Sequence, residues 1–99
     1  MLMEFAGYEV NVFLSITDFK KSGSWIPDAY LIDRQLEGED GLDLCRQLKA
    51  DPKTQSVPVV IMSASVDVAA IASEAGADAF LPKPFTKAQL QEVMRGVFK

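Results

Sequence analysis

The sequence predicts an α/β domain in which a parallel sheet is covered by helices on both faces. Apolar runs alternate with amphipathic helical stretches along the 99 residues, which is typical of successive βαβ units. The runs at 29–32 and 59–62 show no polar alternation, so we expect central strands that are buried on both faces. Right-handed crossovers would link parallel strands near 8–13, 29–33, 58–63 and 79–82.

The strand at 8–13 differs because its residues alternate in polarity. Val10 and Val12 are interleaved with Glu9 and Asn11, the pattern of a strand with one face in water. Such a strand is expected at the edge of the sheet.

The segment 15–28 carries weaker signals. Asp18 to Ser22 could form one or two helical turns before a turn around Gly23, and Trp25 has no assigned role.

Three amphipathic stretches predict helices. Their apolar stripes are Leu44, Cys45 and Leu48; Val68, Ile71, Ala72 and Ala75; and Leu90, Val93, Met94 and Val97. The first helix should end before Pro52, and the second at Gly76, where a left-handed cap is needed. The third should begin at Thr86, whose partner Gln89 completes a capping box.

Three polar residues follow apolar runs, at the ends of three predicted strands. They are Asp33, Ser63 and Lys83, and ligands of open parallel sheets gather outside the carboxyl ends of the strands. An aspartate can attack phosphorus as a nucleophile, a lysine can offset the charge of an anionic donor, and a hydroxyl can donate to a phosphoryl oxygen. In another interpretation, Asp33 is a turn residue, Ser63 caps a helix and Lys83 is an exposed turn lysine.

Composition excludes several classes of protein. Cys45 is the only cysteine and there is no histidine, so an internal disulfide, most zinc sites and histidine catalysis are excluded. Cys45 lies on an apolar stripe and is expected in the core of a cytoplasmic protein. The net charge of −4, with scattered lysines, argues against nucleic-acid binding, and no apolar run reaches membrane-spanning length.

Four motifs carry a family resemblance. They are PDAYLID at 27–33, GEDGL at 38–42, VPVVIMSA at 57–64 and AGADAFLPKPF at 75–85. Together with GYEV at 7–10, in this order and spacing, they resemble the receiver domain of response regulators in two-component signalling, similar to the chemotaxis response regulator. The resemblance implies a flavodoxin-like fold and a single receiver-like domain over 1–99.

The resemblance also implies roles for individual residues. Asp33 would accept a phosphoryl group from a sensor histidine kinase or a phosphotransfer protein, and would bind Mg²⁺ together with the backbone carbonyl of Gln35. Ser63 would follow the phosphoryl group, Phe80 would be the switch aromatic, and Lys83 the charge partner. In the alternative interpretation, Phe80 is an ordinary residue of the hydrophobic core. The sequence leaves the isomer of the bond between Lys83 and Pro84 open, and a cis bond is a candidate.

The chain departs from the family pattern at its start. A complete receiver opens with an apolar strand that ends in an acidic pair, followed by a full first helix, and those acids are the main Mg²⁺ ligands. Here 1–7 resembles only the last turns of that helix, with Glu4 on the helix remnant and no substitute for the pair. Glu37 also stands where the family usually has proline. We therefore expect a domain that is incomplete at its N-terminus, with weak Mg²⁺ binding.

The missing strand would have lain between 8–13 and 29–33. Because unpaired buried backbone is costly, we expect 8–13 to slide inward, giving the strand order 8–13, 29–33, 58–63, 79–82. The helix at 86–98 alone would then cover one face, which favours poor stability or a homodimer. Two functions stay open: a phosphoacceptor whose native activity belongs to a longer protein, and a non-phosphorylated interaction module.

Overall fold

The computed structural model describes residues 2–15, 26–37, 39–65 and 67–98. The predicted turns at 18–22 and Trp25 lie outside these ranges. The elements are β1 (Leu2–Phe5), β2 (Tyr8–Ser15), β3 (Ala29–Glu37), β4 (Glu39–Asp40), α2 (Gly41–Ala50), β5 (Val59–Ser63), α3 (Val68–Glu74), β6 (Ala79–Pro82) and α4 (Lys87–Val97).

The main sheet has the strand order β1-β2-β3-β5-β6, and β4 pairs with β3 beside it. The pairs β2 with β3, β3 with β5 and β5 with β6 are all parallel. The predicted fold class and the predicted order of its four strands are thus confirmed. In this arrangement β2 lies directly against β3, so the backbone of β3 is paired on both sides.

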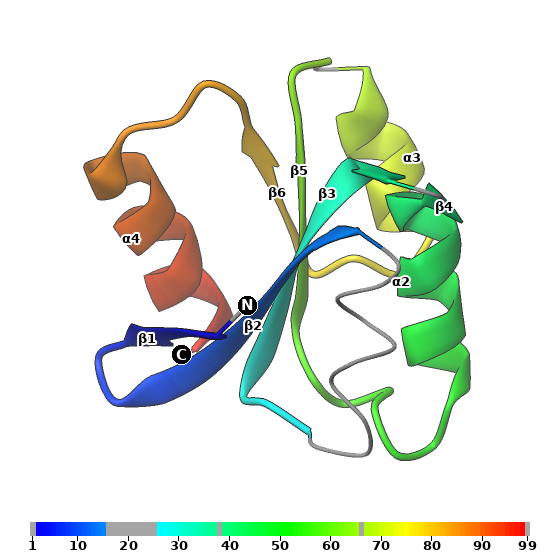
Figure 1. Ribbon diagram of the computed structural model, residues 1–99, viewed down its shortest axis with the longest axis horizontal. Coiled ribbons are helices and arrows are strands. Elements are labelled where there is room, and N and C mark those ends of the chain that lie inside the picture. The colour runs from blue at the N-terminus through cyan, green and yellow to red at the C-terminus, as the bar shows by residue number, and fades with distance from the viewer. Residues whose placement is uncertain (1, 16–25, 38, 66, 99) are drawn as a thin grey trace.

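Helices cover both faces of the sheet, as predicted (Figure 1). Helix α4 lies on one face, over an apolar cluster that includes Val10, Leu31 and Met94. Helices α2 and α3 lie on the other face, over a second cluster that includes Phe13 and Ile32. Neighbouring residues of β3 enter opposite clusters because side chains alternate between the faces of a strand.

The expectation of a helix remnant at 1–7 is wrong. Residues Leu2–Phe5 form β1, which pairs antiparallel with β2. The turn consists of Ala6 and Gly7, with φ angles of 51° and 88°, and positive φ at both turn positions suits a two-residue hairpin. Met3 and Phe5 pack on the α4 side, while Glu4 is exposed on a strand rather than a helix.

The edge position predicted for 8–13 is also wrong, because β1 covers that side of β2. The polar residue that suggested a wet face, Asn11, is only 4 % exposed. Strand β3 continues past Asp33 to Glu37, because its last residues pair with β4.

The capping predictions for the helices are confirmed, but the predicted burial of Ile71 is wrong. Thr86 and Gln89 form the capping box of α4, and Gly76 has a φ angle of 94° after α3. Ile71, however, is 41 % exposed. In a helix of seven residues, the side chains that face the sheet are Val68 and Ala72, and Ile71 falls beside that stripe.

The large bare apolar face expected over the α4 side is not seen in the described residues. Met3 and Phe5 of β1 pack against the apolar cluster there, and Tyr8 stacks on Phe98 with ring centroids 4.0 Å apart. The exposed large apolar side chains among the described residues are Tyr8 on β2, Ile26 before β3 and Ile71 on α3. No described helix combines the length and the apolar character needed to cross a membrane.

Candidate functional site

Asp33 is the last residue of β3 that pairs in parallel with β5. Its side chain is 16 % exposed and accepts two polar contacts. The backbone N–H of Gln35 donates to Oδ1 at 3.0 Å, and Nζ of Lys83 lies 2.5 Å from Oδ2. The carboxylate is therefore fixed in orientation and paired with a positive charge.

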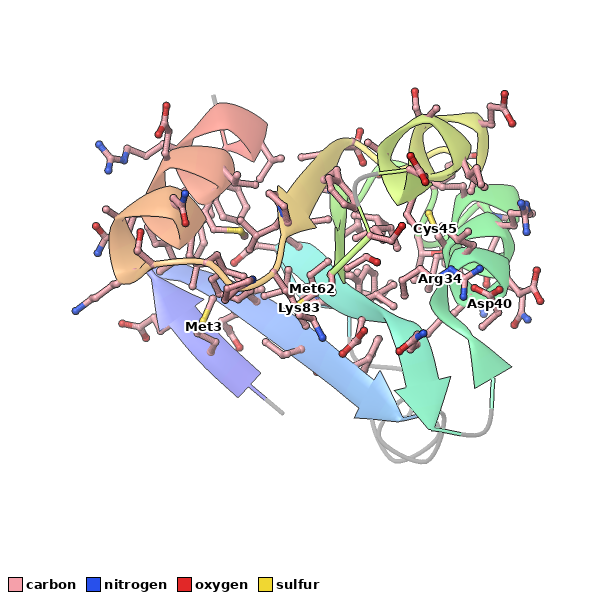
Figure 2. The ribbon with its side chains drawn as sticks, turned by 90° about the horizontal axis from the view of Figure 1, so that it is seen from above. Met3, Arg34, Asp40, Cys45, Met62 and Lys83 are labelled. Atoms are coloured by element: carbon pink, nitrogen blue, oxygen red, sulfur yellow. The ribbon has the colours of Figure 1, made fainter. Side chains whose placement is uncertain are left out.

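Lys83 follows β6 and reaches Asp33 across the end of β5. Its backbone N–H donates to the carbonyl of Ser63 at 2.8 Å, which continues the β5–β6 pairing beyond the last strand residue. The peptide bond to Pro84 is cis. Figure 2 shows the Lys83 side chain extending from the end of β6 toward β3.

Ser63, the last residue of β5, is 7 % exposed. Its hydroxyl oxygen accepts the backbone N–H of Ser65 at 3.1 Å. Asp33, Ser63 and Lys83 line one cavity of about 240 Å³, together with Gln35, Ala64 and Ser65. The structure therefore brings Asp33, Ser63 and Lys83 together at one edge of the sheet.

Phe80 lies apart from this cavity. It is half-buried in β6 and packs against the cluster under α2 and α3. It borders a separate cavity of about 120 Å³ beside α3. Phe80 therefore contacts the α3 side of the sheet and does not line the cavity that contains Asp33.

The start of α2 is joined to β3 through three residues to which the sequence reasoning gave no role at the site. A Cβ atom on Gly41 would lie 2.2 Å from the carbonyl oxygen of Asp33, so α2 begins in contact with the β3 backbone. Asp40 caps α2 through Leu42 N–H at 2.9 Å, and its other oxygen lies 3.5 Å from Arg34. Figure 2 shows Arg34 beside Asp40. The sequence Asp40–Gly41 is a recognisable signal for the start of a helix. The close approach of Gly41 to the Asp33 backbone, however, can be seen only in the folded structure.

Cys45 confirms its predicted place in the core under α2. The thiol is fully buried and lies 3.5 Å from the carbonyl oxygen of Ala75. Burial, with a smaller contribution from Asp78, raises the pKa of the Cys45 thiol to about 11, against the lowering effects of Lys49 and Arg46.

The residues around the cavity fit a Mg²⁺ ion only in part. Mg²⁺ requires about six oxygen ligands, usually including one or two carboxylates. Asp33 supplies one carboxylate, which already binds Lys83, and Gln35 also lines the cavity. The described residues hold no group of three or more acidic, histidine or cysteine side chains placed for a metal.

The fold and the site define a class of protein. The sequence matches the response regulator receiver domain family over residues 2–95, and the chain therefore belongs to this family.

Known relatives and solved structures agree with this class. The phosphate regulon transcriptional regulatory protein PhoB of Rhizobium meliloti is 28 % identical over 98 % of this chain and 44 % of its own length. The response regulator MprA of Mycobacterium ulcerans is 32 % identical over 98 % of this chain and 42 % of its own length. The chain thus spans less than half of each of these two relatives.

A solved structure extends the likeness to the fold. It is the receiver domain of the sensor histidine kinase PA1611 from Pseudomonas aeruginosa PAO1, described with a magnesium ion coordinated in its active-site cleft. The TM-score is 0.72 at 26 % identity, covering 87 % of this chain and 74 % of that one.

Proposed function

We propose that this receiver domain accepts a phosphoryl group on Asp33 from a sensor histidine kinase or a phosphotransfer protein. The observation that carries the proposal is the Asp33–Lys83 contact of 2.5 Å inside a cavity that also contains Ser63. These groups come from three strands and meet at one edge. The proposed role is that of a cytoplasmic phosphoacceptor in a phosphorelay, not of an enzyme with its own substrate turnover.

The chemistry follows from the residue types. A carboxylate oxygen of Asp33 would attack phosphorus, forming an acyl phosphate as the bond from phosphorus to the donor breaks. The donor group leaves with the electron pair of that bond. Lys83 would offset the added negative charge, because its ammonium group is already beside the reacting carboxylate. The Ser63 hydroxyl would donate to a phosphoryl oxygen, and Phe80 would respond to that movement from the α3 side.

Mg²⁺ would be held by the Asp33 carboxylate and the Gln35 carbonyl, and would supply additional positive charge for the same transfer. We propose that binding is weak. One carboxylate that is already paired with Lys83 is a small share of the six ligands that the ion requires. Phosphorylation of this chain should be slow for the same reason.

A second candidate function is a non-phosphorylated interaction module. It is favoured by the ion pair between Lys83 and Asp33, which gives a stable site without any added group. A homodimer through the α4 face has less support, because β1 and the Tyr8–Phe98 stack cover part of that face.

Incubation with acetyl phosphate and Mg²⁺, followed by intact mass spectrometry, tests the proposal. We expect slow, incomplete addition of one phosphoryl group to the wild type and none to Asp33→Asn. Rapid stoichiometric modification would contradict the weak metal site. Complete absence of modification at high Mg²⁺ and long times would instead favour the interaction module.

A further inference from the structure

We propose that the outer edge of β1 is a docking site for an extended segment of a partner protein, in which basic residues alternate with apolar ones. Strand β1 pairs with β2 on one side, and no strand of the described residues pairs with its other side. It contains no proline, so its outward backbone groups can extend the ladder. Figure 1 shows β1 at the rim of the sheet, beside α4.

The hairpin geometry decides which backbone groups face outward. Phe5 and Tyr8 flank the two-residue turn, and pairs in an antiparallel ladder alternate between hydrogen-bonded and non-hydrogen-bonded positions. Counting from the bonded closing pair, Glu4 and its partner Glu9 take a non-hydrogen-bonded position. The N–H and C=O of Glu4 therefore point away from β2, toward the open edge.

The face of the hairpin that turns away from α4 concentrates negative charge. Glu4 and Glu9 are exposed and directly opposite each other, and like charges at such positions repel. Asp28 lies beside them, since its Oδ2 accepts the Glu9 N–H at 2.7 Å. All ion pairs found in the described part of the chain use other carboxylates. A basic side chain next to Glu4 would relieve this repulsion.

The opposite face of β1 is apolar. Met3 and Phe5 pack against the cluster under α4, and Phe5 stacks near Phe98 with ring centroids 6.3 Å apart. An added strand alternates its side chains in the same way. Its apolar residues would extend this cluster, while its lysines or arginines would lie beside Glu4 and Glu9.

A second copy of the chain fits this edge less well. A two-fold axis that pairs β1 with another β1 keeps equivalent faces on the same side of the joined sheet. The Glu4 and Glu9 carboxylates of both copies would then share one face, in a chain whose net charge is already −4. Charge repulsion therefore favours a cationic segment over a dimer.

The experiment uses a short, capped peptide of alternating valine and lysine, with a valine–glutamate peptide as its counterpart. We expect the lysine peptide to bind and to protect the Glu4 amide of the wild type from hydrogen exchange. Glu4→Lys should weaken binding roughly five- to ten-fold, because it replaces an attraction by a repulsion. Glu4→Pro should abolish it by removing the outward N–H, which takes no part in the β1–β2 ladder.

Glu92→Lys on α4 is the matched control, because it changes the net charge equally at an exposed position on another element. It should bind the peptide like the wild type, as should Asp33→Asn, whose altered group lies outside the docking edge. Equal weakening by Glu4→Lys and Glu92→Lys would overturn the proposal in favour of non-specific attraction. Unchanged hydrogen exchange at Glu4 in the wild type, or a dimer that occupies β1, would overturn it as well.

Discussion

At the carboxyl ends of β3, β5 and β6, Asp33 is held by Lys83 from 50 positions along the chain. At the β1–β2 hairpin, Glu4 stands opposite Glu9, and the described residues supply no basic partner. The first region joins opposite charges from distant strands in a partly buried cavity, whereas the second gathers like charges from neighbouring strands on the exposed face of a hairpin. Two acidic regions of one small sheet thus differ in whether the fold or a partner must supply the compensating charge.

The two regions also differ in packing, and the largest expected effect tests that difference. Gly41→Ala places a Cβ atom 2.2 Å from the Asp33 carbonyl oxygen, so α2 must move away from the site. We expect a loss of about 3 kcal/mol in the free energy of unfolding, measured by urea denaturation.

Gly96→Ala is the control for that substitution. Gly96 is also helical, but nothing lies within 4 Å of an added Cβ atom. It should stabilise the protein by about 0.5–1 kcal/mol, because alanine loses less conformational freedom than glycine in a helix. Equal effects of the two substitutions would show that α2 does not press against β3.

The burial of the Cys45 thiol beneath α2 predicts a loss of stability at alkaline pH. The unfolded thiol of Cys45 ionises near pH 9.0, whereas the pKa of the folded thiol is about 11. Between these values the unfolded state alone releases its proton, so the stability present below pH 9 is lost as the pH rises. We expect a loss of about 2 kcal/mol from this group.

Denaturation of the wild type and Cys45→Ala across the same pH range isolates this contribution. The difference between their unfolding free energies should shrink toward pH 11, because the variant lacks the thiol. A constant difference would mean that the Cys45 thiol ionises as easily in the folded state as in the unfolded one.

Breaking the compensated pair at the site should have a moderate effect. Lys83→Met leaves the Asp33 carboxylate, which is 16 % exposed, without its cation. Lys83 itself is partly exposed, so we expect a cost of about 1 kcal/mol in thermal or urea unfolding. When Asp33→Asn is already present, Lys83→Met should lower the free energy of unfolding by less. Equal losses in the wild type and in Asp33→Asn would argue against a stabilising ion pair.

The smallest expected effect has the opposite sign and lies at the hairpin. Glu4→Lys turns the pair with Glu9 from like to opposite charge. We expect stabilisation by about 0.5 kcal/mol at low salt, with a smaller gain at high salt. Destabilisation would show that the carboxylate of Glu4 is already compensated in the folded protein.

The predictions from sequence succeeded where a local signal decides the outcome. The capping box of Thr86 and Gln89 needs only neighbours on the same helix, and Gly76 only its own backbone. The helix predicted at the start of the chain was wrong, because a segment as short as Leu2–Phe5 has no periodicity that separates the end of a helix from a strand. The exposure predicted for Asn11 and the burial predicted for Ile71 were wrong, because burial depends on which other elements pack against a side chain.

By itself, the sequence determined the alternation of strands and helices, the order of the four parallel strands, and the polar residues that end three of them. The alternation and the polar residues follow from hydrophobic periodicity along the chain. The strand order follows from the resemblance to receiver domains together with the cost of unpaired backbone. The tertiary structure alone decided that β1 would pair with β2, that Gly41 would touch Asp33, and that Glu4 would face an open edge. Those are contacts between elements, and their distances depend on how the elements pack, which no local pattern specifies.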